Sequence, residues 1–274
     1  MGELHLRGAR VNRVEFRLLG PVGIWHEGQP LGHTTPQQRS VLSTLLLNSN
    51  QVVPIDSIVR ALWGEEPPNS ARNAVQGYVS KLRRILKDFP ENEISTHLQG
   101  YSLRADKEQV DLHRFRHLVD MAQKSDAVRA GELLGKALDL WHGPPLSGVA
   151  GQWLTSTAGV YMEEERLSAL EEHATAVLEA GRVHDAIRDL TSLVIEHPLR
   201  ERAASLLMTA LHRSGRRGDA LTVFRDIRRH LVKELGIEPG SILHNTHQEV
   251  LSDISDVLRE SKNAPQEECA GVSP

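Results

Sequence analysis

Residues 69–87 carry side chains that could make directional hydrogen bonds to another molecule. The segment has five basic residues and no acidic one. On a helix, an advance of 100° per residue gathers its amide, hydroxyl and basic groups on one face. These are Asn73, Gln76, Ser80, Arg84 and Lys87, with Gly77 and Arg83 beside them. Asn and Gln can bond adenine edges twice, Arg can do so at guanine, and Lys and Ser suit phosphate oxygens.

The opposite side of this segment is apolar. Its residues recur at steps of four and three: Ala71, Val75, Tyr78, Leu82 and Ile85, with Val79 and Leu86 widening the face. That spacing predicts an amphipathic helix. A solvated basic face is the ordinary explanation for a single basic helix, so the elements around it must decide between that and binding.

The chain before this helix predicts strands and turns. Residues 14–18 alternate apolar and polar side chains, and residues 22–25 favour a second strand. Residues 28–30 are typical of a turn, after which Leu31 is expected to begin a third short strand.

Two helices are predicted next. Thr35 can cap the first, Pro36 suits its first turn, and Gln38 completes a capping box. We expect this helix to end near Asn48. A second helix is expected over residues 55–63, with Ile58, Val59, Leu62 and Trp63 facing inward and Gly64 as its stop. Asn69 or Ser70 is expected to cap the basic helix.

A β-hairpin is predicted after the basic helix. Ile94, Thr96 and Leu98 alternate with polar residues, Gln99–Gly100 is expected to form the turn, and Tyr101, Leu103 and Ala105 alternate again. Strands, three helices and a hairpin in this order predict a winged helix-turn-helix whose third helix enters a DNA groove. The hairpin would be the wing, with Ser95, Thr96, His97 and Arg104 near phosphate or the minor groove.

The first part of the chain resembles the DNA-binding domain of the Streptomyces antibiotic regulatory protein (SARP) family. The likeness rests on PQQRSVLSTLLLNSNQVVPIDSIVRALWGEEPPNSARNAVQGYVSKLRRIL and on the hairpin HLQGYSLRA. LWG, NAVQGYVSKLRR and GYSL are specific in combination. The resemblance implies an OmpR-type winged helix. We find no receiver domain ahead of it and therefore expect no regulation through a receiver aspartate.

Residues 107–260 are predicted to be entirely helical. WHGPPLSGV at 141–149 and LGIEP at 235–239 resemble the bacterial transcriptional activation domain of the same family. Larger members continue into ATPase and sensor domains, whereas this sequence ends in a polar stretch.

A repeat of 34 residues lies within this half. Three pairs share the offset: Gly181 and Gly215, Ala186 and Ala220, Leu190 and Phe224. Ala174 and Pro198 fall where a tetratricopeptide repeat has a small residue and its closing proline, whereas the second copy has Met208 and Val232 there. Stacked helix pairs with a protein-binding surface are expected, and a purely structural helical bundle is the alternative.

Composition is that of an ordinary globular protein: 39% hydrophobic and 25% charged, with a net charge of −4. Residues 1–106 hold 12 Lys and Arg against 10 Asp and Glu, and the remainder holds 20 against 26. The basic excess thus sits in the half that holds the basic helix. With one cysteine, Cys269, and neither a signal-peptide pattern nor a long apolar run, we expect a cytoplasmic protein.

Enzymatic motifs are missing from the sequence. It has no Walker loop, no dinucleotide fingerprint and no zinc-protease motif. His113 with His117 and His244 with His247 have helical spacing, but neither pair has a cysteine nearby. We predict no catalysis, no cofactor and no metal.

The sequence therefore predicts a mainly α fold with small β elements. Residues 1–13 would be flexible, residues 14–106 an OmpR-type winged helix, residues 107–260 a tetratricopeptide-like activation domain, and residues 261–274 a disordered tail.

The functional expectation is a transcriptional activator of a secondary-metabolite gene cluster. It would bind promoter direct repeats as side-by-side copies and, as the resemblance implies, recruit RNA polymerase holoenzyme through its sigma factor and alpha subunit near the −35 element. Candidate base contacts are Asn73, Gln76, Ser80 and Arg84. Candidate phosphate contacts are Arg72, Lys81, Arg83 and Lys87, the first-helix residues Thr35, Gln38 and Arg39, and the wing residues His97 and Arg104. The alternative is a protein-binding adaptor that does not bind DNA.

Overall fold

The computed structural model describes residues 13–262. The predictions for residues 1–12 and 263–274 lie outside this range, and the last described helix runs two residues into the predicted tail. The chain divides into two compact units, residues 1–169 and 170–274, which are described separately. Within the described chain, no helix has both the length and the apolar character needed to cross a membrane.

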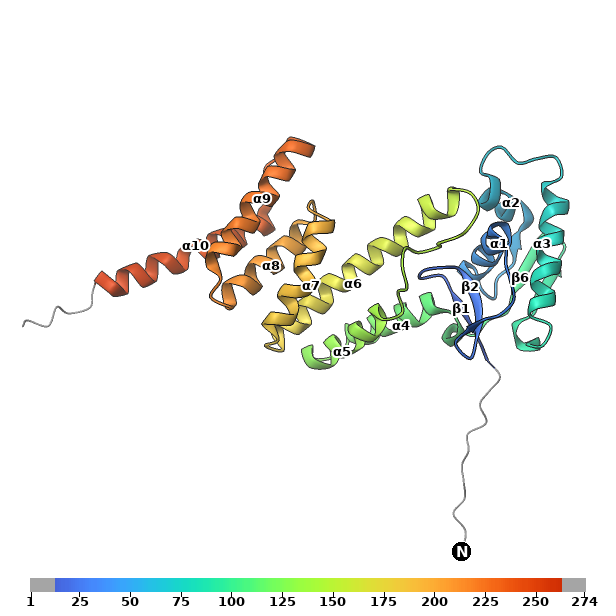
Figure 1. Cartoon of the computed structure of the whole chain (residues 1–274), viewed down its shortest axis with the longest axis horizontal. Coiled ribbons are helices and arrows are strands. Elements are labelled where there is room, and N and C mark those ends of the chain that lie inside the picture. The colour runs from blue at the N-terminus through green and yellow to red at the C-terminus, as the bar shows by residue number, and fades with distance from the viewer. Residues whose placement is uncertain (1–12, 263–274) are drawn as a thin grey trace, which may run out of the picture. The chain divides into compact units, whose positions relative to one another are not determined.

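The first unit begins with two small antiparallel sheets and three helices (Figure 1). One sheet has the order β1 (Val14–Arg17), β2 (Gly23–His26), β3 (Gln29–Pro30). The other has the order β4 (Val53–Pro54), β6 (Gly100–Leu103), β5 (Ile94–His97). The helices are α1 (Pro36–Leu47), α2 (Ile55–Trp63) and α3 (Ala71–Ile85). This is the predicted winged helix, with β5 and β6 as the wing.

Local signals set the start of α1 and the end of α2. The Thr35 side chain accepts a bond from the Gln38 amide, and the Gln38 side chain accepts one from the Thr35 amide, which confirms the capping box. Gly64 follows α2 with a φ of 65°, a backbone conformation that favours glycine. Trp63 is only partly buried, whereas Ala61, which was not predicted to face inward, is fully buried.

Two local expectations were wrong, and a third was met in position only. Residues 29–30 form β3 instead of a turn, because the hairpin from β2 turns at Glu27 and Gly28. Ser70 stands at the N-cap of α3, but no side-chain cap bond is formed. The wing turns at Leu98 and Gln99, and Gly100 belongs to β6.

Gly100 is required by its neighbour across the sheet. A Cβ at this position would lie 1.9 Å from the carbonyl oxygen of Val53 in β4. The amide of Ile55 also donates to the carbonyl of Gln99 at 2.9 Å. The wing is therefore joined to the start of α2 through close backbone contact.

Short 3₁₀ turns lie between α3 and β5 (Pro90–Asn92) and between β6 and α4 (Lys107–Gln109). The first unit then continues into α4 (Asp111–Ala122) and α5 (Ala127–Leu138). A π-helical turn, Thr155–Gly159, precedes α6 (Val160–Glu179). One hydrophobic core runs from Phe16 in β1 to Phe115 in α4 and Leu134 in α5. The core is thus continuous across residue 106, and the predicted domain boundaries stay a prediction.

Segment 141–151 connects α5 to α6 and bonds along the winged helix. His142 and Leu146 donate backbone bonds to the carbonyls of Leu19 and Leu18, at 2.7 and 2.8 Å. At the other end, the Ser40 hydroxyl of α1 bonds both the amide and the carbonyl of Ala150. This segment therefore holds β1 and α1 against the rest of the first unit.

The second unit contains α7 (Val183–Glu196), α8 (Glu201–Arg213), α9 (Arg217–Leu235) and α10 (Ser241–Lys262). Gly181 and Gly215 have φ values of 78° and 77° in equivalent turns. The arginine after each glycine makes the same backbone hydrogen bond in both copies. The amide of Arg182 donates to the carbonyl of Val177, and the amide of Arg216 donates to the carbonyl of Leu211, both at 2.9 Å. The 34-residue repeat is thus present in backbone geometry.

The two copies differ where the sequence departs from the pattern. Pro198 follows the end of α7, whereas Val232 occupies the matching position and lets α9 continue to Leu235. Gly236, with a φ of 68°, then ends α9 in a left-handed cap.

Candidate nucleic-acid interface

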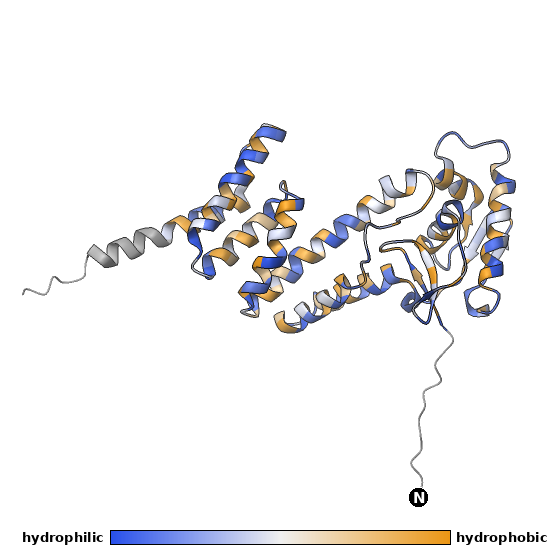
Figure 2. Cartoon of the chain, viewed as in Figure 1, coloured by the Kyte–Doolittle hydropathy of each residue, from blue (hydrophilic) through white to orange (hydrophobic). Residues whose placement is uncertain are grey.

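The α3 helix is fixed by its apolar side. Ala71, Val75, Val79 and Leu82 are buried, with Val75 and Leu82 fully inaccessible. Tyr78 and Ile85, by contrast, are half-buried. Polar and apolar segments follow one another along this helix (Figure 2). The packing leaves the opposite side of α3 facing solvent.

The exposed side of α3 holds the candidate base contacts. Asn73, Gln76, Ser80 and Arg84 are all exposed, and within residues 13–262 their side chains make no hydrogen bond or ion pair. Lys81 and Lys87 share both properties. Six predicted site residues therefore share two properties: Asn73, Gln76, Ser80, Lys81, Arg84 and Lys87 are exposed, and their side chains are unbonded. We call these six residues the α3 face, although Lys87 lies in the turn after α3, because the helix ends at Ile85 and not at residue 87 as predicted.

Two predicted phosphate contacts on α3 have partners within the chain. The Arg83 Nε donates to the Ile94 carbonyl at 2.8 Å, and its Nη2 donates to the Thr96 hydroxyl at 2.7 Å. Its guanidinium also lies 5.9 Å from the centre of the Tyr101 ring. Arg72 pairs with Asp56 of α2 at 2.6 Å, and both side chains stay largely exposed. Arg83 thus links α3 to the wing, a role that its sequence position did not reveal.

The wing carries its own internal bonds. A ring nitrogen of His97 lies 2.8 Å from the Ser102 hydroxyl, across the hairpin. Arg104 donates to the carbonyls of Glu91 and Pro90, at 3.0 and 2.8 Å. Leu98 at the turn is fully exposed. His97 and Arg104 are therefore accessible but engaged, and their contact with DNA stays a prediction.

The start of α1 offers fewer free donors than its sequence suggested. Gln38 is 8% exposed and its side chain is used in the capping box. Arg39 donates to the Thr34 hydroxyl at 3.2 Å and toward the Gly148 carbonyl at 3.4 Å. Pro36 has no amide hydrogen, so the Gln37 amide is the donor left open in the first turn. A phosphate at this helix end would rely chiefly on that group.

The histidine pairs are placed apart from any metal-like cluster. No group of three potential metal ligands occurs in the part of the chain that the structure covers. Burial lowers the pKa of His113, and its Nδ1 is buried without a partner. His247 stacks on Phe224 with ring centres 3.8 Å apart, and burial lowers its pKa as well.

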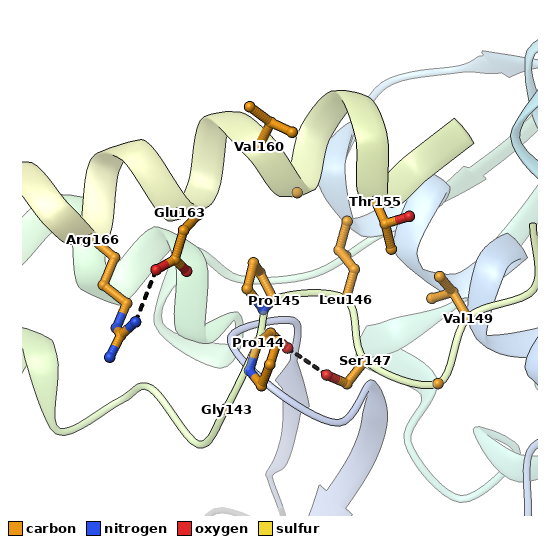
Figure 3. Close-up of a pocket in the computed structure, with 12 residues that line it drawn as sticks. Gly143, Pro144, Pro145, Leu146, Ser147, Val149, Thr155, Val160, Glu163 and Arg166 are labelled. Atoms are coloured by element: carbon orange, nitrogen blue, oxygen red, sulfur yellow. Dashed lines mark hydrogen bonds and ion pairs between the residues drawn. The ribbon is translucent and has the colours of Figure 1, made fainter. Parts of the chain in front are cut away.

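A hollow of about 600 Å³ lies elsewhere in the first unit, between residues 143–149 and the start of α6 (Figure 3). Glu163 and Arg166 in its lining bond each other at 2.8 Å. The Ser147 hydroxyl bonds the Pro144 carbonyl at 2.5 Å. The charged groups of this hollow are thus satisfied internally, unlike those of the α3 face.

A buried carboxylate, Asp111, was not anticipated from the sequence. Its oxygens accept from the amides of Leu18, Leu19 and Leu112 at 2.7–2.9 Å. Burial raises the pKa of Asp111 to about 6, although these bonds lower it. Asp111 therefore ties the start of α4 to the end of β1. A lone aspartate after an extended segment gives no signal of such a contact.

A winged helix followed by helical repeats defines a class of bacterial transcriptional regulator, and the family models agree. "Transcriptional regulatory protein, C terminal" matches residues 28–103, and "Bacterial transcriptional activator domain" matches residues 110–251. The solved structure of Mycobacterium tuberculosis EmbR in complex with a low-affinity phosphopeptide superposes with a TM-score of 0.83 at 33% identity. That match covers 88% of this chain and 65% of EmbR.

Curated relatives place the chain more narrowly. Regulatory protein AfsR of Streptomyces coelicolor is 40% identical over 87% of this chain, which spans only 24% of AfsR. Transcriptional regulator RedD of the same species is 37% identical over 87% of this chain and 71% of RedD. Regulatory protein DnrI of Streptomyces peucetius is 31% identical, over 92% of this chain and 97% of DnrI. The chain belongs to the Streptomyces antibiotic regulatory protein family of transcriptional activators.

Proposed function

We propose that this chain activates transcription by binding promoter DNA sequence-specifically, with α3 lying in the major groove. One observation supports this most strongly: the six side chains of the α3 face are exposed and have no partner within residues 13–262. Unpaired cations are free to replace the counterions of phosphate groups, and unbonded amides are free to read base edges.

The residue roles follow from what each side chain already bonds. Arg84 is the candidate for a guanine edge, and Asn73 and Gln76 are the candidates for adenine. Lys81 and Lys87 would contact phosphates, as would Arg72 after loosening its exposed pair with Asp56. Arg83 would position the wing, because its guanidinium is already bonded there.

Family membership supports the wider setting of the proposal. Successive direct repeats in a promoter would hold copies side by side, and contacts to RNA polymerase sigma factor and alpha subunit near the −35 element would activate a secondary-metabolite gene cluster. These steps would take place in the cytoplasm. Because the chain spans about a quarter of the AfsR relatives, their full activities are not transferred to it.

Selection from a library of random duplexes tests the DNA-binding step. The full chain should enrich a sequence with two copies of one motif in the same orientation, spaced by about one helical turn of DNA. A mobility shift with the enriched duplex should then survive an excess of scrambled competitor. If no sequence is enriched, or if scrambled duplex competes equally, the protein-binding adaptor becomes the better explanation.

Activation needs a separate measurement. The enriched sequence would be placed upstream of a weak −35 element, and transcripts would be counted with purified RNA polymerase holoenzyme. We expect more transcript with the protein than without it, and no increase when the two motifs are scrambled. Binding without any increase would leave a DNA-binding protein that does not recruit polymerase.

A further inference from the structure

Gly77 lies in the middle of α3 and is exposed. A Cβ added to it would have no atom within 4 Å, and its backbone is helical and not left-handed. Glycine costs more helix stability in such a position than any residue except proline. Nothing inside the described chain therefore explains why this position lacks a side chain.

Several other glycines of the chain have such an explanation, whereas Gly218 in the first turn of α9 does not. Gly64, Gly181 and Gly215 end helices with positive φ, and Gly100 admits the Val53 carbonyl. Gly77 has neither a special backbone conformation nor a close neighbour. Gly77 differs from Gly218 in its place among the exposed residues of the α3 face, where a missing Cβ would let another molecule come close.

The neighbours of Gly77 indicate which molecule that is. On a helix, Asn73 lies one turn before it and Ser80 and Lys81 one turn after it, and Gln76 precedes it. All four are exposed residues of the α3 face. Gly77 is thus central, with Lys81 as the cation within one turn of it, whereas Arg72 and Arg84 lie toward the ends of the helix and Lys87 beyond its end.

We propose that the α3 backbone at Gly77 comes into contact with base edges on the floor of the major groove. This inference rests on the proposed function and names the point of closest approach. Protein N–H···O hydrogen bonds span about 2.7–3.2 Å between heavy atoms. A methyl group at residue 77 would hold the helix outward and stretch the bonds that Asn73 and Gln76 make to bases, while flexible lysines would still reach phosphates.

Gly77→Ala tests the inference because stability and binding should change in opposite directions. The melting temperature of the full chain should rise by about 2–4 °C, since alanine favours the helix. Affinity for the duplex selected by the wild-type protein should fall by about tenfold, as expected for the loss of one good base contact. Affinity for a scrambled duplex of the same length, and the dependence on salt, should not change.

Gly218→Ala is the matched control. Gly218 is also helical and exposed, with no atom within 4 Å of an added Cβ, but it belongs to α9 in the second unit. This variant should gain thermal stability without losing affinity for either duplex.

Three results would overturn the inference. Unchanged affinity of Gly77→Ala for the selected duplex would show that the backbone does not approach DNA there. An equal loss on selected and scrambled duplexes would place the contact at phosphate instead of base edges. A fall in melting temperature would mean that the fold itself requires the glycine. Failure of the wild-type protein to prefer any duplex would be seen first, and would remove the proposed function together with this inference.

Discussion

The α3 face and the helical repeat both carry exposed basic residues, but those of the repeat pair with nearby carboxylates and those of the α3 face do not. In the repeat, Arg182 bonds Asp185 at 2.9 Å and Arg216 bonds Asp219 at 2.7 Å, each three residues along the chain. Lys81 and Arg84 on α3, and Lys87 in the turn after it, have no such partner among the described residues. The cause lies in the sequence, because segment 69–87 contains no acid that a helical neighbour could supply.

This contrast separates charges that serve the fold from charges that are left for a ligand. The Arg182 side chain lowers the pKa of Asp185, and the Arg228 side chain lowers the pKa of Glu238, as expected for carboxylates held by a bonded cation. Unpaired cations on a rigid helix are open to a polyanion instead. Arg83 stands between the two groups, since it lies on α3 but bonds the wing.

Charge reversal should expose the contrast most strongly. If Arg84 contacts DNA as proposed, Arg84→Glu would place a carboxylate against it and should weaken binding to the selected duplex by about 100-fold or more, through a lost base contact and added repulsion. Arg216→Glu makes the same change in the repeat and should leave DNA affinity unchanged. Fluorescence anisotropy titrations of both variants provide the measurement. Similar losses in the two would mean that overall charge, and not the α3 face, sets affinity.

Asp111 extends the comparison to a charge whose partners are all backbone amides. Asp111→Asn removes one accepting oxygen, leaves a buried amide unbonded, and should lower the free energy of unfolding by about 2 kcal/mol. Urea unfolding of the full chain, followed by circular dichroism, measures this loss.

The pH dependence of that stability has a definite sign. Because burial raises the pKa of Asp111 from 3.8 to about 6, the folded state holds a proton over this range that the unfolded state has lost. This residue's contribution to the free energy of unfolding should therefore fall as pH rises from about 4 to 6, and then stay level. Asp111→Asn should lack that component. An identical pH profile in wild type and variant would contradict the assignment.

A substitution of Arg83 should have a smaller effect on DNA affinity, and it separates two roles for this residue: positioning the wing and contacting phosphate. Arg83→Lys keeps the charge but loses the paired bonds to Ile94 and Thr96, so affinity for the selected duplex should fall by about threefold to tenfold as the wing loses its preorganised position. Amide exchange in residues 94–103 should quicken, while the salt dependence of binding stays the same. Thr96→Val, which removes only the acceptor, should quicken exchange in the same segment. Wild-type binding by Arg83→Lys would return Arg83 to the phosphate contacts predicted from sequence.

Local patterns were sufficient for much of the fold. The capping box of Thr35 and Gln38 involves residues three apart, and the apolar spacing of α3 lies within one helix, so both follow from the sequence. The 34-residue repeat was also visible, because Gly181 and Gly215 need the same left-handed turn.

Contacts between distant residues could not be predicted in the same way. Ser40 bonds Ala150 across 110 residues, and Asp111 bonds Leu18 across 93. The one-residue shift of the wing turn has a similar cause, since Gly100 must admit the Val53 carbonyl. For the candidate site, the sequence identified the side chains of α3, but not that Arg83 turns toward the wing.

The salt dependence of DNA binding tests the central claim most directly. Lys81→Ala/Lys87→Ala removes two unpaired lysines, and Lys124→Ala/Lys233→Ala removes two that pair with Asp120 and Glu234, at 2.9 and 3.0 Å. For the first variant, the slope of log affinity against log salt should become shallower by about 2, and for the second it should not change. An unchanged slope for the first variant, or equal changes in both, would contradict the assignment of α3 as the DNA-contacting helix.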